Sequence, residues 1–280
     1  MSPKVSIIMG IYNCASTLPE AIDSIVSQTF SDWELIMCDD GSTDHTYQVA
    51  LEYAQNDPNR FILLRNKKNQ GLNITLNRCL REATGEYIAR MDGDDISLPD
   101  RLQIEVDFLD THPEYALVST PMLYFDETGI WGQGSAIEIP KIEDFVFHAP
   151  FHSHAPCMIR HEAFFSVSGY SEDPRLLRYE DCNLWYKLYS AGYRGYNIQQ
   201  PLYMMRDDRT AYKRRTFSSR FRAVYVQYSG FRMIQMPAKY YPYLLLGCIK
   251  CFLLAFMPSA LYDIMHKWKL KASPATIPTT

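Results

Sequence analysis

VSIIMGIYNCASTLPEAIDSIVSQTFSDWELIMCDDGSTDHT, residues 5–46, contains two successive strand–turn–helix units. The apolar run VSIIM is typical of a short buried strand, and apolar residues then recur at helical spacing from Leu18 onward. Thr17 and Glu20 have the spacing of a capping box, which predicts that the first helix begins there. A second apolar run at 33–38, the turn DDGS and a helix expected over 43–56 repeat the unit.

The same alternation continues down the chain. We expect strands at 61–64 and 86–91 and helices over 71–84 and 99–111. Repeated strand–helix units predict an α/β domain with a parallel, doubly wound sheet. In such sheets ligands bind beyond the carboxyl ends of the strands, and both acidic clusters of the sequence, Asp39–Asp40 and Asp92–Asp95, follow predicted strands.

The segment RMDGDDISLPDR, residues 90–101, concentrates four carboxylates at Asp92, Asp94, Asp95 and Asp100. Adjacent carboxylates repel one another unless a cation neutralises them, and oxygen ligands suit Mg²⁺ or Mn²⁺. The alternative is a turn that caps the next helix, with Asp95 or Ser97 as the cap. Because a cap requires one acid rather than three, a metal site at Asp92 and Asp94 is the favoured interpretation.

The charge is distributed unevenly along the chain. Residues 1–208 hold 16 basic and 31 acidic side chains, whereas residues 209–280 hold 12 basic side chains and a single acid, Asp263. The acidic body argues against general nucleic-acid binding, and the basic, apolar end of the chain suits a membrane surface. Seven scattered cysteines and the absence of a signal-peptide pattern predict a reduced, cytoplasmic protein.

The stretch from Tyr243 to Met257 is almost uninterruptedly apolar over 15 residues. A membrane-spanning helix needs ~20 residues, so we expect a helix that lies in the interface of the membrane. Trp268 and lysines 267, 269 and 271 would anchor it at the headgroups. The alternative is a helix pair packed on the catalytic domain or on a second subunit of a homo-oligomer, since an apolar face of this size must be covered.

The order of these motifs resembles glycosyltransferase family 2. The resemblance rests on residues 5–46 and on GLNITLNRCLREATGEYIARMDGDDISLPDRL, residues 71–102, and with a later Glu-Asp pair it extends from residue 4 to about 205. It implies an inverting, nucleotide-sugar-dependent enzyme of the GT-A fold, a Rossmann-like mixed sheet flanked by helices. We expect a GT-A catalytic domain over 1–208, divided into a donor half, 1–98, and an acceptor half, 99–208. A helical region over 209–280 follows.

Carried over by position, the resemblance assigns donor contacts to four residues. Tyr12 would lie against the nucleotide base and Asp40 on the base or ribose, while Asp92 and Asp94 would serve the ribose, the diphosphate and a Mn²⁺ or Mg²⁺ ion. For Tyr12 the chemistry alone leaves open a core aromatic at a strand end. Gly10 stands where relatives often have a polar residue that holds the nucleotide.

The pair Glu180–Asp181 matches the Glu-Asp motif in which, by resemblance, the Asp is the catalytic base. Displacement of a nucleoside diphosphate by a sugar hydroxyl needs such a carboxylate to accept the hydroxyl proton. The alternative is an acidic first turn that complements the helix dipole.

Acceptor contacts are expected from His154 and Trp131. His154 lies in a segment that resembles the family's acceptor region, although a lone histidine is as often a hydrogen-bonded structural group. Trp131 belongs to the irregular, aromatic-rich stretch WGQGSAIEIP. Arg206 and the run Lys213–Arg215 are candidate clamps for the donor diphosphate, the alternative being a solvated basic loop.

The motifs together with the resemblance imply a metal-dependent glycosyltransferase that adds one sugar, most simply from a UDP-sugar, to a growing surface glycan of the O-antigen or capsule type. By resemblance, the acceptor would be carried on a polyprenyl diphosphate lipid at the inner face of the cell membrane. The Gln-x-x-Arg-Trp motif of processive synthases is absent, which favours single transfer. A sugar-nucleotide pyrophosphorylase would require a Gly-rich, Arg-containing loop that MGIYNCAST lacks. A non-catalytic glycan-binding or scaffold subunit is the other alternative.

Overall fold

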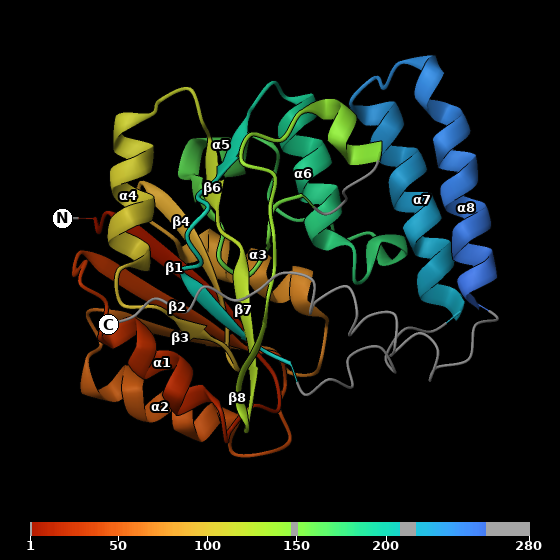
Figure 1. The fold of residues 1–280 in the computed structure, drawn as a ribbon. Coiled ribbons are helices and arrows are strands. Elements are labelled where there is room, and N and C mark those ends of the chain that lie inside the picture. The colour runs from red at the N-terminus through yellow and green to blue at the C-terminus, as the bar shows by residue number, and fades with distance from the viewer. Residues whose placement is uncertain (1, 147–150, 208–216, 256–280) are drawn as a thin grey trace.

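The computed structural model describes residues 2–146, 151–207 and 217–255, and a seven-stranded sheet forms its centre (Figure 1). The strand order is β10-β6-β9-β4-β1-β2-β3. In chain order these strands are β1 Val5–Ile11, β2 Trp33–Asp39, β3 Phe61–Arg65, β4 Tyr87–Asp92, β6 Leu117–Ser119, β9 Met158–Arg160 and β10 Gly195–Asn197. The expected strand–helix alternation is therefore present through the first half of the chain.

Helices cover both faces of this sheet, as the two-sided apolar strands require. Helices α1 (Leu18–Val26), α2 (Thr46–Asn56) and α4 (Arg101–Thr111) pack on one face. Helices α3 (Leu72–Glu82), α5 (His161–Ser166) and α6 (Glu180–Ser190) pack on the other. Alternate residues of β1 divide between the two layers, with Ile7 and Met9 in the first and Ile8 in the second.

The sheet is mixed, as the family resemblance implies, and is not wholly parallel. Strands β3, β2, β1 and β4 are parallel, whereas β9 runs antiparallel to both of its neighbours, β4 and β6. The alternation of strands and helices predicted only parallel pairing. That expectation fails at β9 because the antiparallel pair β7 (Met122–Asp126) and β8 (Gly129–Gln133) stands between β6 and β9 where a parallel connection would have a crossover helix.

A second, four-stranded sheet stands beside the first, in the order β5-β11-β7-β8. Its strands are β5 Ile96–Ser97, β7 Met122–Asp126, β8 Gly129–Gln133 and β11 Tyr203–Arg206. The antiparallel pair β7–β8 extends along the front of the molecule in Figure 1. Because β5 follows the acidic turn directly and pairs with β11, this sheet ties the turn to a segment more than one hundred residues away.

Helices α7 (Phe217–Met233) and α8 (Tyr241–Ala255) pack against each other beyond α6 (Figure 1). Gly230 of α7 lies so close to α6 that a Cβ atom there would come within 2.2 Å of the Tyr186 ring. Within the part of the chain that the structure describes, no helix is long and apolar enough to cross a membrane. Lys213–Arg215, residues 256–257, Trp268 and lysines 267, 269 and 271 lie outside the described residues.

Candidate functional site

The carboxyl ends of β1, β2 and β4 meet at one edge of the sheet. In the strand register Gly10 of β1 stands beside Asp92 of β4, and Ile11 stands beside Asp39 of β2. The structure thus brings together the segments that carry Tyr12, Asp40 and Asp92, as expected for a parallel sheet of this kind.

At this edge, hydrogen bonds join the loop after β1 to the DDGSTD turn after β2. Asn13 donates its backbone N–H to the Ser42 Oγ at 3.0 Å, and its own side-chain oxygen accepts from the Thr43 N–H at 2.9 Å. Gly41 has φ +73°, and a Cβ there would approach the Lys68 backbone to 2.7 Å. The helix expected from residue 43 begins at Thr46, because the turn residues before it form hydrogen bonds with the neighbouring loop instead of helical ones.

Tyr12 follows β1 at this edge and is 46% exposed. Its side chain therefore does not belong to the core, and the core-aromatic alternative is wrong. Gly10 lies in β1 itself, where a Cβ would contact Leu72 Cδ1 at 3.0 Å and Thr75 Cγ2 at 3.3 Å. Helix α3 thus fills the space that a side chain at position 10 would need.

Asp40 is buried and holds a loop in place. One carboxylate oxygen accepts from Asn66 Nδ2 at 2.7 Å and from the Gln70 N–H at 2.8 Å, and the other accepts from the Gly71 N–H at 2.9 Å. These bonds fix the segment that leads into α3. In the structure Asp40 therefore positions this loop, at the same edge of the sheet where the resemblance expects Asp40 to contact the base or ribose.

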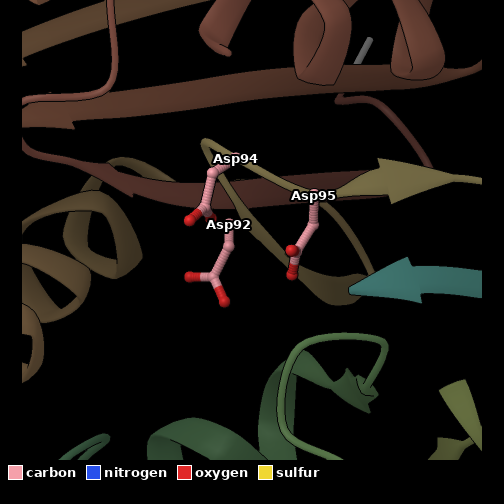
Figure 2. A group of neighbouring side chains, drawn as sticks. All are labelled: Asp92, Asp94 and Asp95. Atoms are coloured by element: carbon pink, nitrogen blue, oxygen red, sulfur yellow. The ribbon is translucent and has the colours of Figure 1, made fainter. Parts of the chain in front are cut away.

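The acidic turn after β4 carries three carboxylates that face the same side, as Figure 2 shows. One oxygen from each of Asp92, Asp94 and Asp95 lies within 4.8 Å of the others. Asp94 is exposed, Asp92 is half-buried and Asp95 is buried. Asp95 does not cap the next helix, as the alternative required, because α4 begins at Arg101 and one oxygen of Asp95 accepts from the Arg206 N–H at 2.8 Å.

Crowding raises the affinity of these groups for protons. Burial and the charge of Asp92 raise the pKa of Asp94, and burial together with the charges of Asp92 and Asp94 raises the pKa of Asp95 well above its usual range. A cation bound between carboxylates this close would relieve their mutual repulsion and favour their ionised form.

The residues present fit a hard divalent cation. The second oxygen of Asp95 is buried without a hydrogen-bond partner among the described residues, and Asp92 and Asp94 offer oxygens on the accessible side. A set of carboxylate oxygens with room for water or phosphate oxygens is what Mg²⁺ or Mn²⁺ requires. The sequence predicted Asp92 and Asp94 as metal ligands, and the structure places Asp95 beside them as a third candidate.

Arg206 of β11 lies against the acidic turn. Its Nε donates to the Asp94 carbonyl at 2.9 Å, its guanidinium pairs with Glu20 of α1, and it lies 4.4 Å from the centre of the Phe125 ring. The helix begins at Leu18 with Thr17 as its N-cap, as predicted, but the capping-box hydrogen bonds are absent and Glu20 pairs with Arg206 instead. Thr17 makes no capping hydrogen bond, and its hydroxyl donates to the Gly93 carbonyl at 3.2 Å instead.

Glu180 and Asp181 form the first turn of α6, where negative charge complements the helix dipole. Burial raises the pKa of both carboxyls, and the charge of Asp181 raises that of Glu180 further. Asp181 Oδ1 accepts from the Cys182 N–H at 2.7 Å, which lowers the pKa of Asp181 in part. A half-buried carboxylate with raised basicity has the chemistry of a general base.

His154 and Trp131 are both engaged with other parts of the protein. His154 Nε2 lies 2.7 Å from the Tyr170 hydroxyl, and burial and the charge of Arg90 hold the pKa of His154 well below its usual range. Trp131 of β8 stacks on Tyr124 and donates to the Asp207 carbonyl at 3.3 Å. His154 thus lies on the α6 side of the sheet, while Trp131 lies on the second sheet near Arg206.

Sequence reasoning missed Arg90, whose guanidinium pairs with Asp92. It also missed the support behind the acidic turn, where the Tyr203 hydroxyl accepts from the Asp92 N–H at 3.2 Å and buried Arg101 donates to the Arg90 carbonyl at 2.9 Å. A cation two residues before an acid in a strand shares its face, and that spacing was the available signal for Arg90.

Solved structures with similar folds come from a bacterium and an archaeon. Residues 1–349 of Staphylococcus aureus TarS in complex with UDP-GlcNAc align with a TM-score of 0.65 over 94% of this chain and 79% of that one, at 17% identity. The mannosyltransferase PcManGT of Pyrobaculum calidifontis, in complex with GDP-Man and Mn²⁺, aligns with a TM-score of 0.60 over 99% and 77%, at 22% identity. The mixed α/β architecture is thus the expected GT-A fold.

Two curated relatives are similar in sequence. EpsE of Bacillus subtilis (strain 168), named as a glycosyltransferase, is 43% identical over 95% of this chain and 94% of its own length. WfgD of Escherichia coli, named a UDP-Glc:alpha-D-GlcNAc-diphosphoundecaprenol beta-1,3-glucosyltransferase, is 37% identical over 38% of this chain and 40% of its own. The model described as glycosyl transferase family 2 matches residues 6–172. The chain therefore belongs to glycosyltransferase family 2.

Proposed function

We propose that the protein is an inverting glycosyltransferase that transfers a single sugar from a nucleotide-sugar, with UDP as the first candidate carrier, to a hydroxyl of a glycan acceptor. The observation that carries the proposal is the placement of two acidic groups. Asp92, Asp94 and Asp95 lie at the carboxyl end of β4, and Asp181 lies in the first turn of the helix α6, which packs on one face of the same sheet.

The two groups suit different halves of one displacement. Asp181 accepts the proton of the acceptor hydroxyl while the oxygen of that hydroxyl bonds to the anomeric carbon of the donor sugar. The bond from that carbon to the diphosphate oxygen breaks on the opposite face, so the configuration inverts. A divalent cation held by Asp92, Asp94 and Asp95 would neutralise the departing diphosphate. Tyr12 offers an exposed ring for the nucleotide base, and Arg206 adds positive charge beside Asp94.

The acceptor and the cellular setting are inferred from the relatives and from the C-terminal helices. WfgD is named for an acceptor on diphosphoundecaprenol, which supports a lipid-linked acceptor for this chain. With that acceptor we place the protein in O-antigen or capsular polysaccharide synthesis. Leu245, Leu246 and Ile249 of α8 are exposed. We assign residues 1–208 to catalysis and 209–280 to attachment at the inner face of the membrane. A second subunit is the alternative partner for α8.

The test is a transfer assay with UDP-, GDP- and dTDP-sugars, a polyprenyl-diphosphate-linked sugar acceptor, and Mn²⁺, Mg²⁺ or EDTA. The proposal expects turnover of one donor class that requires the metal, and a product whose anomeric configuration, measured by NMR, is opposite to that of the donor. A product with retained configuration would contradict the assignment of Asp181. Failure of every donor to bind or react would favour the scaffold alternative.

A further inference from the structure

Tyr203 of β11 is fully buried and binds the backbone of the acidic turn. Its hydroxyl accepts a hydrogen bond from the Asp92 N–H at 3.2 Å. Strand β11 meets the turn at a second point, since the Arg206 N–H donates to Asp95 Oδ1 at 2.8 Å. Because Asp92 and Asp95 are the first and the last of the three carboxylate residues, β11 holds the turn at both ends.

The ring of Tyr203 rests against a buried cation, Arg101 of α4. The guanidinium carbon of Arg101 lies 5.2 Å from the centre of the ring, within the range of a cation–π interaction. Arg101 Nη2 also donates to the Arg90 carbonyl at 2.9 Å, two residues before Asp92 in β4. Arg101 therefore contacts both the strand that leads into the turn and the ring whose hydroxyl binds the turn.

Arg101 is paired with Glu105, one helical turn further along α4. Its Nε lies 3.3 and 3.2 Å from the two carboxylate oxygens, and the two side chains are 1% and 0% exposed. A buried ion pair is often no more stabilising than well-packed apolar residues of similar volume. Stability therefore does not explain the pair, whereas the contacts of Arg101 with the Arg90 carbonyl and the Tyr203 ring place it in support of the turn.

Support of this kind matters because the three carboxylates of the turn repel one another. One oxygen from each of Asp92, Asp94 and Asp95 lies within 4.8 Å of the others. If the turn were free to relax, a cation would have to draw these groups together as it binds. Contacts that hold the turn beforehand reduce that cost, as hydrogen-bond partners behind metal ligands do in general.

We propose that Tyr203 is a positioning residue of the acidic turn, whose hydroxyl, supported by the Arg101–Glu105 pair, keeps the three carboxylates arranged for a divalent cation. This role rests on the proposed binding of a metal and the donor diphosphate at the turn. Tyr203 itself touches neither of them.

The test is the affinity of the full chain for Mn²⁺ alone, measured from the electron paramagnetic resonance signal of the free ion. Tyr203→Phe loses one hydroxyl and keeps the buried ring. Loss of a hydrogen-bond partner behind a metal site typically weakens metal binding about 10- to 100-fold, so we expect a dissociation constant about tenfold higher.

Tyr87→Phe is the matched control. Tyr87 is also a fully buried tyrosine, its hydroxyl binds Asp110, and it begins β4 at the end away from the acidic turn. The control loses the same chemical group from the same sheet, and it should bind Mn²⁺ like the wild type.

Hydrogen exchange of the Asp92 amide, followed by NMR in the absence of metal, is the second readout. Tyr203→Phe removes the acceptor of this N–H, so exchange at Asp92 should become about fivefold faster, the equivalent of one typical hydrogen bond. The amides of β1 should exchange as in the wild type. A variant that merely loosened the fold would speed exchange along β1 as well.

A double variant tests the ion pair. Arg101→Met with Glu105→Leu removes both charges together, so no buried charge is left alone and the chain should fold. It should bind Mn²⁺ more weakly than the wild type, by about the same factor as Tyr203→Phe. Wild-type affinity in the double variant would exclude the pair from this role.

Wild-type Mn²⁺ affinity in Tyr203→Phe, or unchanged exchange at Asp92, would overturn the proposal. An equal loss of affinity in Tyr87→Phe would overturn it too, because any buried hydroxyl of the sheet would then have the same effect. If the wild type bound no Mn²⁺, the metal site of the proposed function would be wrong, and this role with it. The wild-type measurement thus separates failure of the proposed function from failure of the role of Tyr203 alone.

Discussion

Tyr12 stands at the edge where three strands end, with its ring accessible to a ligand. Stacking of a base on an aromatic ring contributes about 1–3 kcal/mol. We therefore expect Tyr12→Ala to weaken donor binding roughly five- to 150-fold with little change in kcat. Tyr12→Phe, which keeps the ring, should bind like the wild type.

Donor affinity is measured by isothermal titration with the nucleotide. Tyr228→Ala, at an exposed tyrosine of α7, controls for the loss of a surface ring. Equal donor affinity in Tyr12→Ala and the wild type would show that Tyr12 does not contact the nucleotide.

The sequence predicted the acidic residues better than the cations that surround them. Asp92 and Asp94 could be identified because their spacing after a strand implies a turn at the edge of the sheet. Arg90 had one local signal, its position two residues before Asp92 in the strand, but its burial depends on tertiary packing that local pattern does not determine. Glu20 was misread for the same reason, since its partner Arg206 is distant in sequence.

At the scale of elements, the contact between α6 and α7 depends on a missing side chain. A Cβ at Gly230 would come within 2.2 Å of the Tyr186 ring, so Gly230→Ala must push the two helices apart. Overpacking of this kind typically costs about 1–3 kcal/mol. We expect a lower midpoint of denaturant unfolding with an unchanged slope.

Gly247→Ala on α8 is the matched control. A Cβ there has its nearest contact at 3.3 Å, with the end of the Gln227 side chain, and alanine favours a helix over glycine by about 1 kcal/mol. The control should be neutral or stabilising. A Gly230→Ala variant as stable as its control would mean that α7 does not pack on Tyr186 in this way.

Helices and strands were predictable from the sequence where the local apolar pattern determines them. The first four strands of the central sheet and the helices between them follow from apolar periodicity, to within a few residues at their ends. The antiparallel β9 and the β5–β11–β7 pairing did not, because these pairs join short segments over long sequence separations. Register of that kind depends on tertiary packing rather than on local propensity.

At the scale of the whole molecule, the end formed by α7 and α8 carries exposed apolar side chains. Among the α8 residues whose side chains the structure describes, Tyr243, Leu245, Leu246 and Ile249 are the large apolar ones that are exposed. Residues 209–280 also carry 12 basic side chains against one acid, which suits an anionic lipid surface. We expect the double change Leu245→Glu with Leu246→Glu to abolish co-sedimentation with vesicles of anionic phospholipid.

The matched control for this double change is Gln55→Glu with Asn56→Glu, which adds the same charge at exposed positions on α2. It should sediment with vesicles like the wild type. Equal vesicle binding by both double variants would contradict the lipid assignment. Loss of a dimer in the Leu245 and Leu246 variant would identify a second copy of the chain as the partner instead.

The division of labour between the two acidic groups is tested most directly by comparing donor binding and sugar transfer in Asp94→Asn and Asp181→Asn, with the exposed Asp107→Asn as control. Asp181→Asn should bind the nucleotide-sugar with metal like the wild type and lose transfer by about 10²–10⁴-fold. Asp94→Asn should lose metal-dependent binding. Full transfer by Asp181→Asn, or unchanged metal-dependent binding by Asp94→Asn, would contradict this account.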